Sequence, residues 1–408
     1  MSNPIRPRDK WFTLIGTVLI EFALGSVYTW SLFNAHLADK LDQPIKQVAF
    51  AFGLLSLALA VASSISGKLQ ERFGIKKVLI FSGLLLGSSL YLTSVASSLT
   101  ALYLCAGFLV GFADGTGYLL ALTNCIKFFP NNKGIASACA IGAYGLGSLG
   151  FKYINMYSLT HFGLENAFDV WGVIAMALVL IGGLLVVEAP KQDRSTSVHK
   201  LTETSDSFTL KQAMSKPQFY MLALIFTTVC MSGLYAIGIA KDIGENYVHL
   251  SAGIAATAVS VIAVANLGGR IVLGVLSDKI TRMYVITIAL VICLAGVSTL
   301  IFITPTLHTF YLSLACIAFS FGGTITVYPS LISDFFGLEN VAKNYGIIYL
   351  GFGIGSFAGS VIASLFGGFL ATFHVMLTLI LVSIALSLII KKPNQSLAVR
   401  LWQNEVTS

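Results

Sequence analysis

A single arginine lies in the interior of a long apolar stretch. Residues 261–280 read VIAVANLGGRIVLGVLSDKI, in which Arg270 is the only charge before Asp278. A cation inside a membrane helix costs roughly 2.5–3.5 kcal/mol on insertion scales, so it indicates a functional site. If the stretch is helical, Arg270 lies about 12 Å inside the aqueous boundary. A guanidinium offers two parallel donors to the two oxygens of a carboxylate, which predicts a binding site for a small carboxylate near the middle of a membrane.

Asn266 precedes Arg270 by one helical turn, so the two side chains share a face, and Asn266 can orient the arginine or the ligand. The alternative for Arg270 is a structural salt bridge inside the bundle, with Glu21 or Asp114 as its partner. These two carboxyl groups also lie in apolar stretches and are the candidates for proton coupling. A carboxyl in such a site stays protonated until a cation pairs with it, so an anion on Arg270 would free a carboxylate and favour its protonation. For Asp114, a hydrogen bond between packed helices is the competing interpretation.

The composition indicates where these residues must lie. The chain has 408 residues, of which 56% are hydrophobic and 11% are charged, whereas about 25% are charged in a soluble protein. A bilayer core requires about 20 apolar residues per helix. We therefore predict an all-α membrane protein with twelve transmembrane helices, at about residues 11–33, 46–67, 78–98, 101–126, 134–159, 167–188, 217–240, 251–276, 284–304, 308–331, 341–365 and 367–390.

The net charge of +7 does not indicate nucleic-acid binding, because of where the charges lie. Twenty of the 25 Lys and Arg residues fall in the two termini and in alternate loops. This asymmetry predicts that both termini are cytoplasmic. Lys152, and Lys241 with Asp242, stand at the outer ends of their spans, where we expect them to be interface anchors.

The cysteines indicate no metal or redox chemistry. All six lie in predicted spans without a CxxC pair, so we expect neither a disulfide nor a metal site, and we expect no cofactor. The first residues lead directly into a full-length span, which is typical of a first membrane helix and not of a cleaved signal peptide.

The chain repeats itself at an offset of 207 to 208 residues. GKLQER at 67–72 recurs as GVLSDK at 274–279, and Tyr144 corresponds to Phe352. We therefore predict two pseudo-symmetric six-helix bundles, residues 1–188 and 217–408, joined by a cytoplasmic linker at 189–216. Such a repeat implies a site at the midplane between the bundles, reached alternately from each side of the membrane.

The two loops of the form Gly-x3-acid-base, one in each bundle, resemble the signature loops of the major facilitator superfamily. More narrowly, the chain resembles the oxalate:formate antiporter family over about residues 11–392. The stretches that carry this second resemblance are GSVYTWSLF (25–33), KFFPNNKG (127–134), AYGLGSLG (143–150), GGRIVLGVLSDKI (268–280), FGGTITVYPS (321–330) and NYGIIYLGFGIGS (344–356).

The resemblance implies a multi-pass transporter of small carboxylates in a bacterial inner membrane, with Arg270 as the anion-binding residue and aromatic side chains lining its cavity. Packing is the alternative role for any one aromatic residue. With the neighbouring positions included, the predicted substrate-binding residues are Arg270, Tyr28, Tyr118, Tyr144, Asn266, Phe321, Tyr328, Tyr349 and Phe352.

One position departs from the family pattern. The oxalate-transporting members place a lysine where this chain has Phe352. A dicarboxylate needs two cations, since a buried unpaired charge costs several kcal/mol. With one arginine, a monocarboxylate such as pyruvate, lactate or formate fits better, and exchange of the oxalate:formate type is the alternative.

The charged residues of the repeated loops, Glu71 and Arg72 with Asp278 and Lys279, are predicted to hold the cytoplasmic side closed in the outward-facing state. An enzyme is disfavoured, because the sequence has no HExxH or GxSG motif. A non-transporting carboxylate sensor would carry a soluble output domain, and both tails are short. We expect a monomer in the lipid bilayer, with a small monocarboxylate and protons as partners; symport and exchange both stay open.

Overall fold

The computed structural model describes residues 7–129, 133–189, 207–337, 340–366 and 368–393, and no strand occurs in these ranges. We call residues 7–189 the N-half and residues 207–393 the C-half. The helices of the N-half are α1 Pro7–Leu24, the 3₁₀ helix η1 Gly25–Leu32, α2 Asn34–Leu41, α3 Ile45–Phe73, α4 Ile75–Ser94, α5 Leu99–Leu102, the π-helix η2 Tyr103–Val110, α6 Gly111–Lys127 and α7 Lys133–Leu185.

The C-half has the same general order of long helices and short connecting ones. Its helices are α8 Leu210–Met214, α9 Pro217–Gly238, α10 Ala240–Asn246, α11 Ala252–Ala256, α12 Ala258–Ser277, α13 Arg282–Phe302, α14 Leu307–Phe336, α15 Val341–Phe366 and α16 Phe369–Ile389. Most of the predicted linker, residues 190–206, lies outside the described residues.

Within the described ranges, eleven helical stretches are long and apolar enough to span a bilayer. The longest, Cys139–Leu185, has 47 residues and would extend about 70 Å if straight, more than twice the ~30 Å hydrocarbon core. The chain turns within it at Gly163, whose φ of 79° suits glycine. Because α7 thus crosses twice, the eleven stretches account for the twelve predicted spans.

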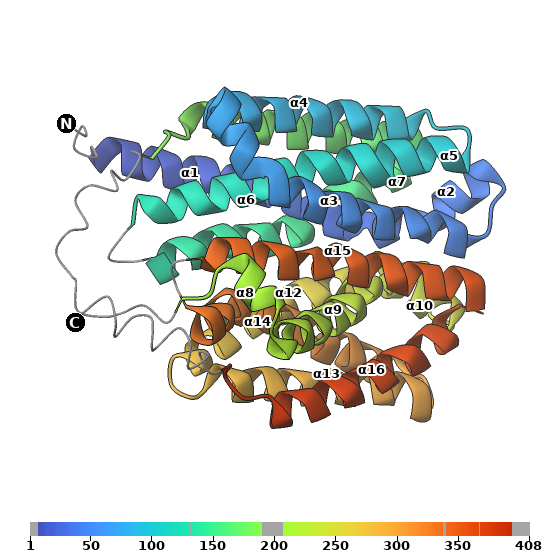
Figure 1. The fold of residues 1–408 in the computed structure, drawn as a ribbon. Coiled ribbons are helices and arrows are strands. Elements are labelled where there is room, and N and C mark those ends of the chain that lie inside the picture. Colours follow the sequence, from blue (N-terminus) through green and yellow to red (C-terminus); the bar gives the residue numbers. More distant parts are fainter. Residues whose placement is uncertain (1–6, 130–132, 190–206, 338–339, 367, 394–408) are drawn as a thin grey trace, which may run out of the picture.

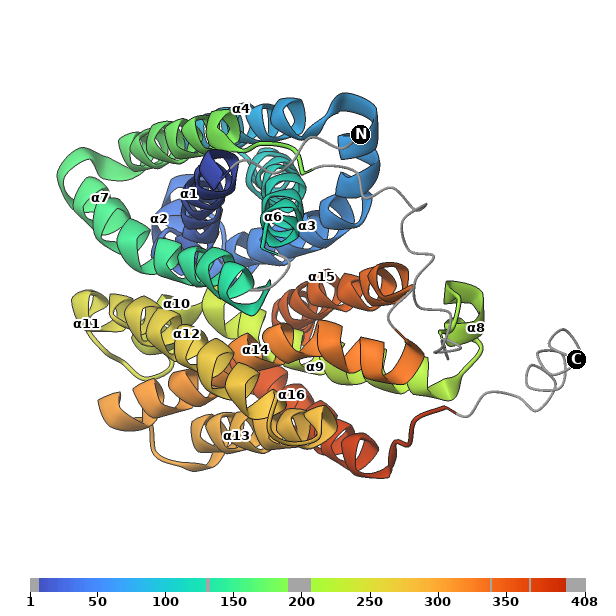
Figure 2. The ribbon, with the colours of Figure 1, turned by 90° about the vertical axis from the view of Figure 1, so that its left-hand side faces the viewer.

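The helices run roughly along one common direction and form two groups (Figure 1). The N-half lies on one side and the C-half on the other, which Figure 2 shows end-on. Helix α1 begins and α16 ends at the same end of the molecule, as an even number of crossings requires. We call this end the terminal face and the other end the opposite face.

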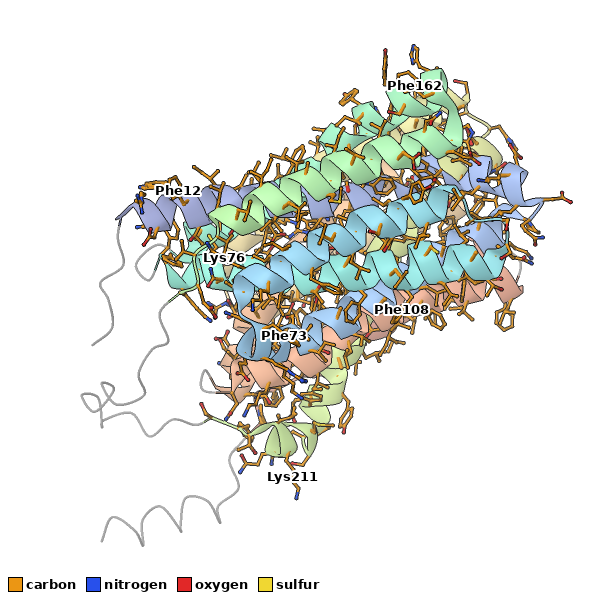
Figure 3. The ribbon with its side chains drawn as sticks, turned by 90° about the horizontal axis from the view of Figure 1, so that it is seen from above. Phe12, Phe73, Lys76, Phe108, Phe162 and Lys211 are labelled. Atoms are coloured by element: carbon orange, nitrogen blue, oxygen red, sulfur yellow. The ribbon has the colours of Figure 1, made fainter. Side chains whose placement is uncertain are left out.

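The outer surface of both groups is rich in apolar side chains. Phe12, Phe108 and Phe162 project outward from the helices (Figure 3) and expose 41%, 53% and 52% of their surface. Exposed phenylalanines in such number are unfavourable in water and suit a helix bundle whose solvent is lipid. Buried polar and charged side chains include Glu21, Asp114 and Arg270.

The closest packing between the halves is that of α3 against α15. At Gly353, a Cβ atom would lie 2.6 Å from the Cα of Leu57, so the helices can approach this closely only because the residue is glycine. The rings of Phe50 and Phe357 meet at 5.3 Å along the same seam. Further contacts between the halves involve α7 with α12 and η1 with α9, and several of these helices carry the residues described next.

A candidate anion-binding site between the two halves

A small cavity lies between the halves, with walls from seven helical segments. Its volume is about 10 Å³, room for about one water molecule. The N-half contributes residues of η1, α3, α6 and α7, and the C-half contributes residues of α12, α14 and α15. The lining residues are Tyr28, Leu59, Tyr118, Tyr144, Arg270, Ile325, Tyr349 and Phe352, and six of these belong to the predicted substrate-binding set.

Arg270 is the cation of this cavity. It is 7% exposed, and its Nε donates a hydrogen bond of 2.8 Å to Oδ1 of Asn266. The amide of Asn266 donates in turn to the carbonyl oxygen of Ala318 at 3.4 Å, so Asn266 orients the arginine and does not itself line the cavity. Nη1 of Arg270 is buried without a hydrogen-bond partner. Arg270 forms no salt bridge with any carboxylate of the described residues.

Three tyrosines of the N-half form a cluster opposite the arginine. The ring of Tyr144 lies between those of Tyr28 and Tyr118, with centroid distances of 5.2 Å to each. This approach of η1 to α7 depends on Gly25, because a Cβ atom there would overlap the carbonyl group of Tyr144. Tyr28 and Tyr118 line the same cavity as Arg270, so the tyrosine cluster and the guanidinium border one space.

Two carboxyl groups are buried behind the tyrosines. Oδ2 of Asp114 accepts a hydrogen bond of 3.0 Å from the hydroxyl of Tyr144. Oδ1 of Asp114 and both oxygens of Glu21 are buried without a partner, and both residues are 0% exposed. Glu21 is within electrostatic reach of both Asp114 and Arg270. The hydrogen bond from α7 to α6 is the helix-packing contact that competes with a role of Asp114 in proton coupling.

Aromatic rings of α15 form the wall of the cavity in the C-half. Phe352 stacks on Tyr349 at 5.3 Å, and Tyr349 contacts Tyr345 at 5.6 Å. The structure does not place the other two predicted aromatics on the cavity. Phe321 packs behind Phe352 at 6.2 Å, and the hydroxyl of Tyr328 donates to the carbonyl oxygen of Leu222 at 2.5 Å.

The four predicted gating residues lie at the terminal face. Glu71, Arg72, Asp278 and Lys279 are all exposed, and none forms a salt bridge with another described residue. The guanidinium of Arg72 lies over the ring of Phe73 at 5.3 Å. The predicted charge pairs are therefore not formed in this conformation.

At the opposite face, the structure corrects the expectation that Lys241 and Asp242 are only interface anchors. Asp242 is 0% exposed, and its Oδ2 accepts a hydrogen bond of 2.6 Å from Nδ2 of Asn34 in the N-half. Sequence reasoning did not select Asn34. The repeat gave a nearby signal, because its offset of 207 residues in this region pairs Asn34 with Lys241, the residue next to Asp242.

Two helix bundles that enclose one buried arginine at their interface form the architecture of a secondary transporter. A family model of the Major Facilitator Superfamily matches residues 13–359 and 238–404, and the chain belongs to this superfamily. It is a multi-pass membrane transporter and not an enzyme.

Within the superfamily, the chain is similar to several individual transporters. The chain is 58% identical over 349 residues to the MFS-type transporter YhjX of Escherichia coli (strain K12), with 86% of each chain covered. It is 29% identical over 366 residues to the oxalate:formate antiporter of Oxalobacter formigenes, with 88% of this chain and 84% of the relative covered. The crystal structure of the nucleoside transporter NupG has the same fold, with a TM-score of 0.68 at 16% identity and coverage of 93% and 97%.

Proposed function

We propose that this protein is a secondary active transporter of a small monocarboxylate of the pyruvate, lactate or formate type, which works by alternating access and is coupled to protons. The observation that carries the proposal is the unpaired guanidinium of Arg270 at a cavity between the halves. A buried cation without a counter-charge costs several kcal/mol, and a carboxylate supplies both the charge and the acceptor oxygens for its free donors.

The walls of the cavity support a substrate with one charge. Opposite the tyrosine hydroxyls, Phe352 and Tyr349 present stacked rings, on which a methyl or methylene carbon can lie. Arg270 is the only cation among the lining residues, so a second carboxylate would face an apolar ring without a partner. A three-carbon acid is larger than the cavity in this conformation, and the halves must separate to admit it.

The buried acids support coupling to protons. Glu21 and Asp114 lie on the N-half side and within electrostatic reach of each other. When Arg270 binds a substrate carboxylate, its charge no longer offsets theirs, so an ionised acid loses its nearest compensation and a proton takes its place. Substrate and proton would then cross together as a neutral pair, and release of the anion would favour release of the proton.

We further propose that the N-half and the C-half are the moving units and that the terminal face is cytoplasmic, in the inner membrane of a bacterium. The excess of Lys and Arg in the loops of that face supports the orientation, and the bacterial relative at 58% identity supports the membrane. In that orientation, this structure is closed toward the outside, where Asn34 joins Asp242. We propose a monomer, since one chain encloses the cavity.

Exchange of the oxalate:formate type is the second candidate, and the 29% identity to the oxalate:formate antiporter of Oxalobacter formigenes favours it. Uptake into proteoliposomes distinguishes the two. Labelled pyruvate, lactate, formate and oxalate are compared with and without an inward proton gradient, and with and without internal formate. We expect monocarboxylates to accumulate with the proton gradient alone. Uptake that requires internal formate and favours oxalate would replace the proposal by the exchanger.

A further inference from the structure

At the opposite face, one side chain of the N-half donates two hydrogen bonds to the C-half. Nδ2 of Asn34 donates to the carbonyl oxygen of Gly238 at 2.9 Å and to Oδ2 of Asp242 at 2.6 Å. Asn34 begins α2, and Gly238 and Asp242 lie at the junction of α9 and α10. The contact is dry, because both side chains are 0% exposed.

The position of this contact follows from the repeat. The repeat offset of 207 residues in this region makes Lys241 the equivalent of Asn34. Asn34 therefore contacts the residue next to its own equivalent, and the contact lies close to the pseudo-two-fold axis that relates the bundles. Residues on such an axis meet when the bundles close at that end and separate when the bundles rock apart. Phe52 fills the space beside Gly238, where a larger side chain would prevent the approach. The junction therefore forms only in conformations closed at the opposite face.

The hydrogen bonding of the junction is incomplete. Oδ1 of Asn34 and Oδ1 of Asp242 are both buried without a partner, so the junction has more acceptors than donors. A proton on Asp242 would change one of these acceptors into a donor and remove the buried negative charge. The closed junction is thus better satisfied by the neutral acid than by the carboxylate.

The surrounding charges do not reverse this preference. Lys241 and Glu245 on α10 form a salt bridge of 3.5 Å with each other, so they largely offset one another. Tyr235 on α9 is within electrostatic reach of Asp242. Helix α11 has no ionisable side chain, and the ionisable side chain of α12 is Arg270, which lies at the central cavity. Burial raises the pKa of Asp242 to about 7, against the lowering effects of Asn34 and Lys241.

On the facing helix α2, the titratable groups are His36, Asp39 and Lys40, and Lys40 forms a salt bridge of 2.6 Å with Glu165. Burial and the neighbouring Lys241 lower the pKa of His36, so protonation of His36 would oppose closure. The two groups therefore act in opposite directions, and the direction of the pH response shows which of them controls the junction. The buried Asp242 has the larger change of surroundings between a closed and an open junction.

We propose that Asn34 and Asp242 form the outer gate of the transporter and that Asp242 is its proton-binding group, whose protonation closes the gate and whose ionisation opens it. The sign follows from linkage: a group whose pKa is higher in the closed state than in the open state, where its ordinary value is about 3.9, stabilises closure as pH falls. The closed fraction should be high at pH 5 and should fall as pH rises through 7. That this gate lies on the outer side of the membrane rests on the proposed orientation, whereas the contact between Asn34 and Asp242 does not depend on it.

The experiment measures the gate directly and without substrate. Spin labels are attached at Ser97→Cys and Ser251→Cys, exposed sites of the two halves at the opposite face, after replacement of the six native cysteines. Double electron–electron resonance in lipid nanodiscs gives the distance between them from pH 5 to pH 8. In the otherwise unchanged chain, we expect the ratio of closed to open molecules to be at least about tenfold higher at pH 5 than at pH 8.

Variants separate Asp242 from the other groups. Asp242→Asn, which is always neutral, should stay closed at every pH, and Asn34→Asp should close only at acid pH, because two carboxylates would face each other. Asp39→Asn, the matched control on the facing helix, should keep the original response. A distance that does not depend on pH, a response that survives in Asp242→Asn, or closure that increases with pH would overturn the proposal. Because no substrate is present, loss of the proposed transport function would not affect this result.

Discussion

In the N-half, two carboxyl groups are buried at the level of the cavity without a cation within salt-bridge distance, whereas in the C-half a guanidinium is buried there without a carboxylate. Glu21 is within electrostatic reach of both Arg270 and Asp114, but neither acid forms a salt bridge with the arginine. If they were paired, the charges would hold the halves together. Unpaired, they leave the arginine for an anion and the acids for protons.

The strongest test of this comparison changes the cation of the C-half. Arg270→Lys keeps the charge but loses the forked donors and the hydrogen bond to Asn266. We expect the apparent affinity for a labelled monocarboxylate to fall about tenfold to a hundredfold, as the loss of a charge-assisted hydrogen bond of about 1.5–3 kcal/mol predicts. Uptake into proteoliposomes measures it. Arg282→Lys, in a pair with Asp334 at the terminal face, is the control and should transport normally. Wild-type affinity in Arg270→Lys would exclude Arg270 as the ligand group.

The second test removes an acid of the N-half. Glu21→Gln and Asp114→Asn should each keep exchange of labelled for unlabelled substrate and lose accumulation driven by a proton gradient. A coupled carrier accumulates its anion about tenfold for one pH unit, and the uncoupled variant should reach only equilibrium. Asp169→Asn is the control in the same half. The carboxyl of Asp169 accepts a hydrogen bond from the hydroxyl of Ser94 and does not line the cavity, so transport by this variant should stay coupled to protons. If both variants with a changed cavity acid still accumulate substrate, neither acid carries the proton.

A third test adds a cation to the wall of the C-half. Phe352→Lys should raise the affinity for oxalate relative to that for a monocarboxylate about fivefold, equivalent to about 1 kcal/mol, because the second carboxylate gains a partner. Phe352→Leu keeps the wall apolar and should keep the wild-type order. Competition of each acid against one labelled monocarboxylate at fixed pH gives the ranking. An unchanged order in the lysine variant would mean that Phe352 does not face the substrate.

We expect the smallest change in conformational population from substitutions in the repeated loops, where the two halves carry similar residues. The repeated loops at the terminal face carry matching charges, and Asp278→Asn or Glu71→Gln should each shift the population toward opening at that face by about twofold to threefold, since a charge at a helix end contributes about 0.3–1 kcal/mol. Labelling of single cysteines on both faces measures the shift. Equal labelling in wild type and variants would show that these loops do not hold the terminal face closed.

Much of this architecture depends on local features of the sequence and could be predicted from them. The twelve spans follow from runs of apolar residues as long as a bilayer is thick, and the two bundles follow from the repeat. Arg270 was identifiable because one charge in an apolar helix is visible without knowledge of its neighbours. Its hydrogen bond with Asn266 joins positions i and i+4 of one helix, which helical geometry alone brings together.

Other features depended on which face each helix turns toward its neighbours. Phe321 and Tyr328 had the right residue types for the cavity, but α14 turns them into the C-half, where Tyr328 reaches the carbonyl group of Leu222. Local periodicity places residues on a common face and does not state what that face contacts. Tyr144 and Phe352 do meet at one cavity, and their equivalence in the repeat predicted that.

The sequence by itself determined the spans, the repeat and the buried ionisable residues, because hydropathy and periodicity are properties of neighbouring residues in the chain. The tertiary structure alone decided that Arg270 forms no salt bridge with an acid of the described residues and that Asn34 contacts Asp242. Both depend on how two bundles dock across more than 200 residues of chain, where a few ångströms separate a salt bridge from two unpaired charges. Distance sets the strength of an electrostatic contact, and packing of the whole bundle sets that distance.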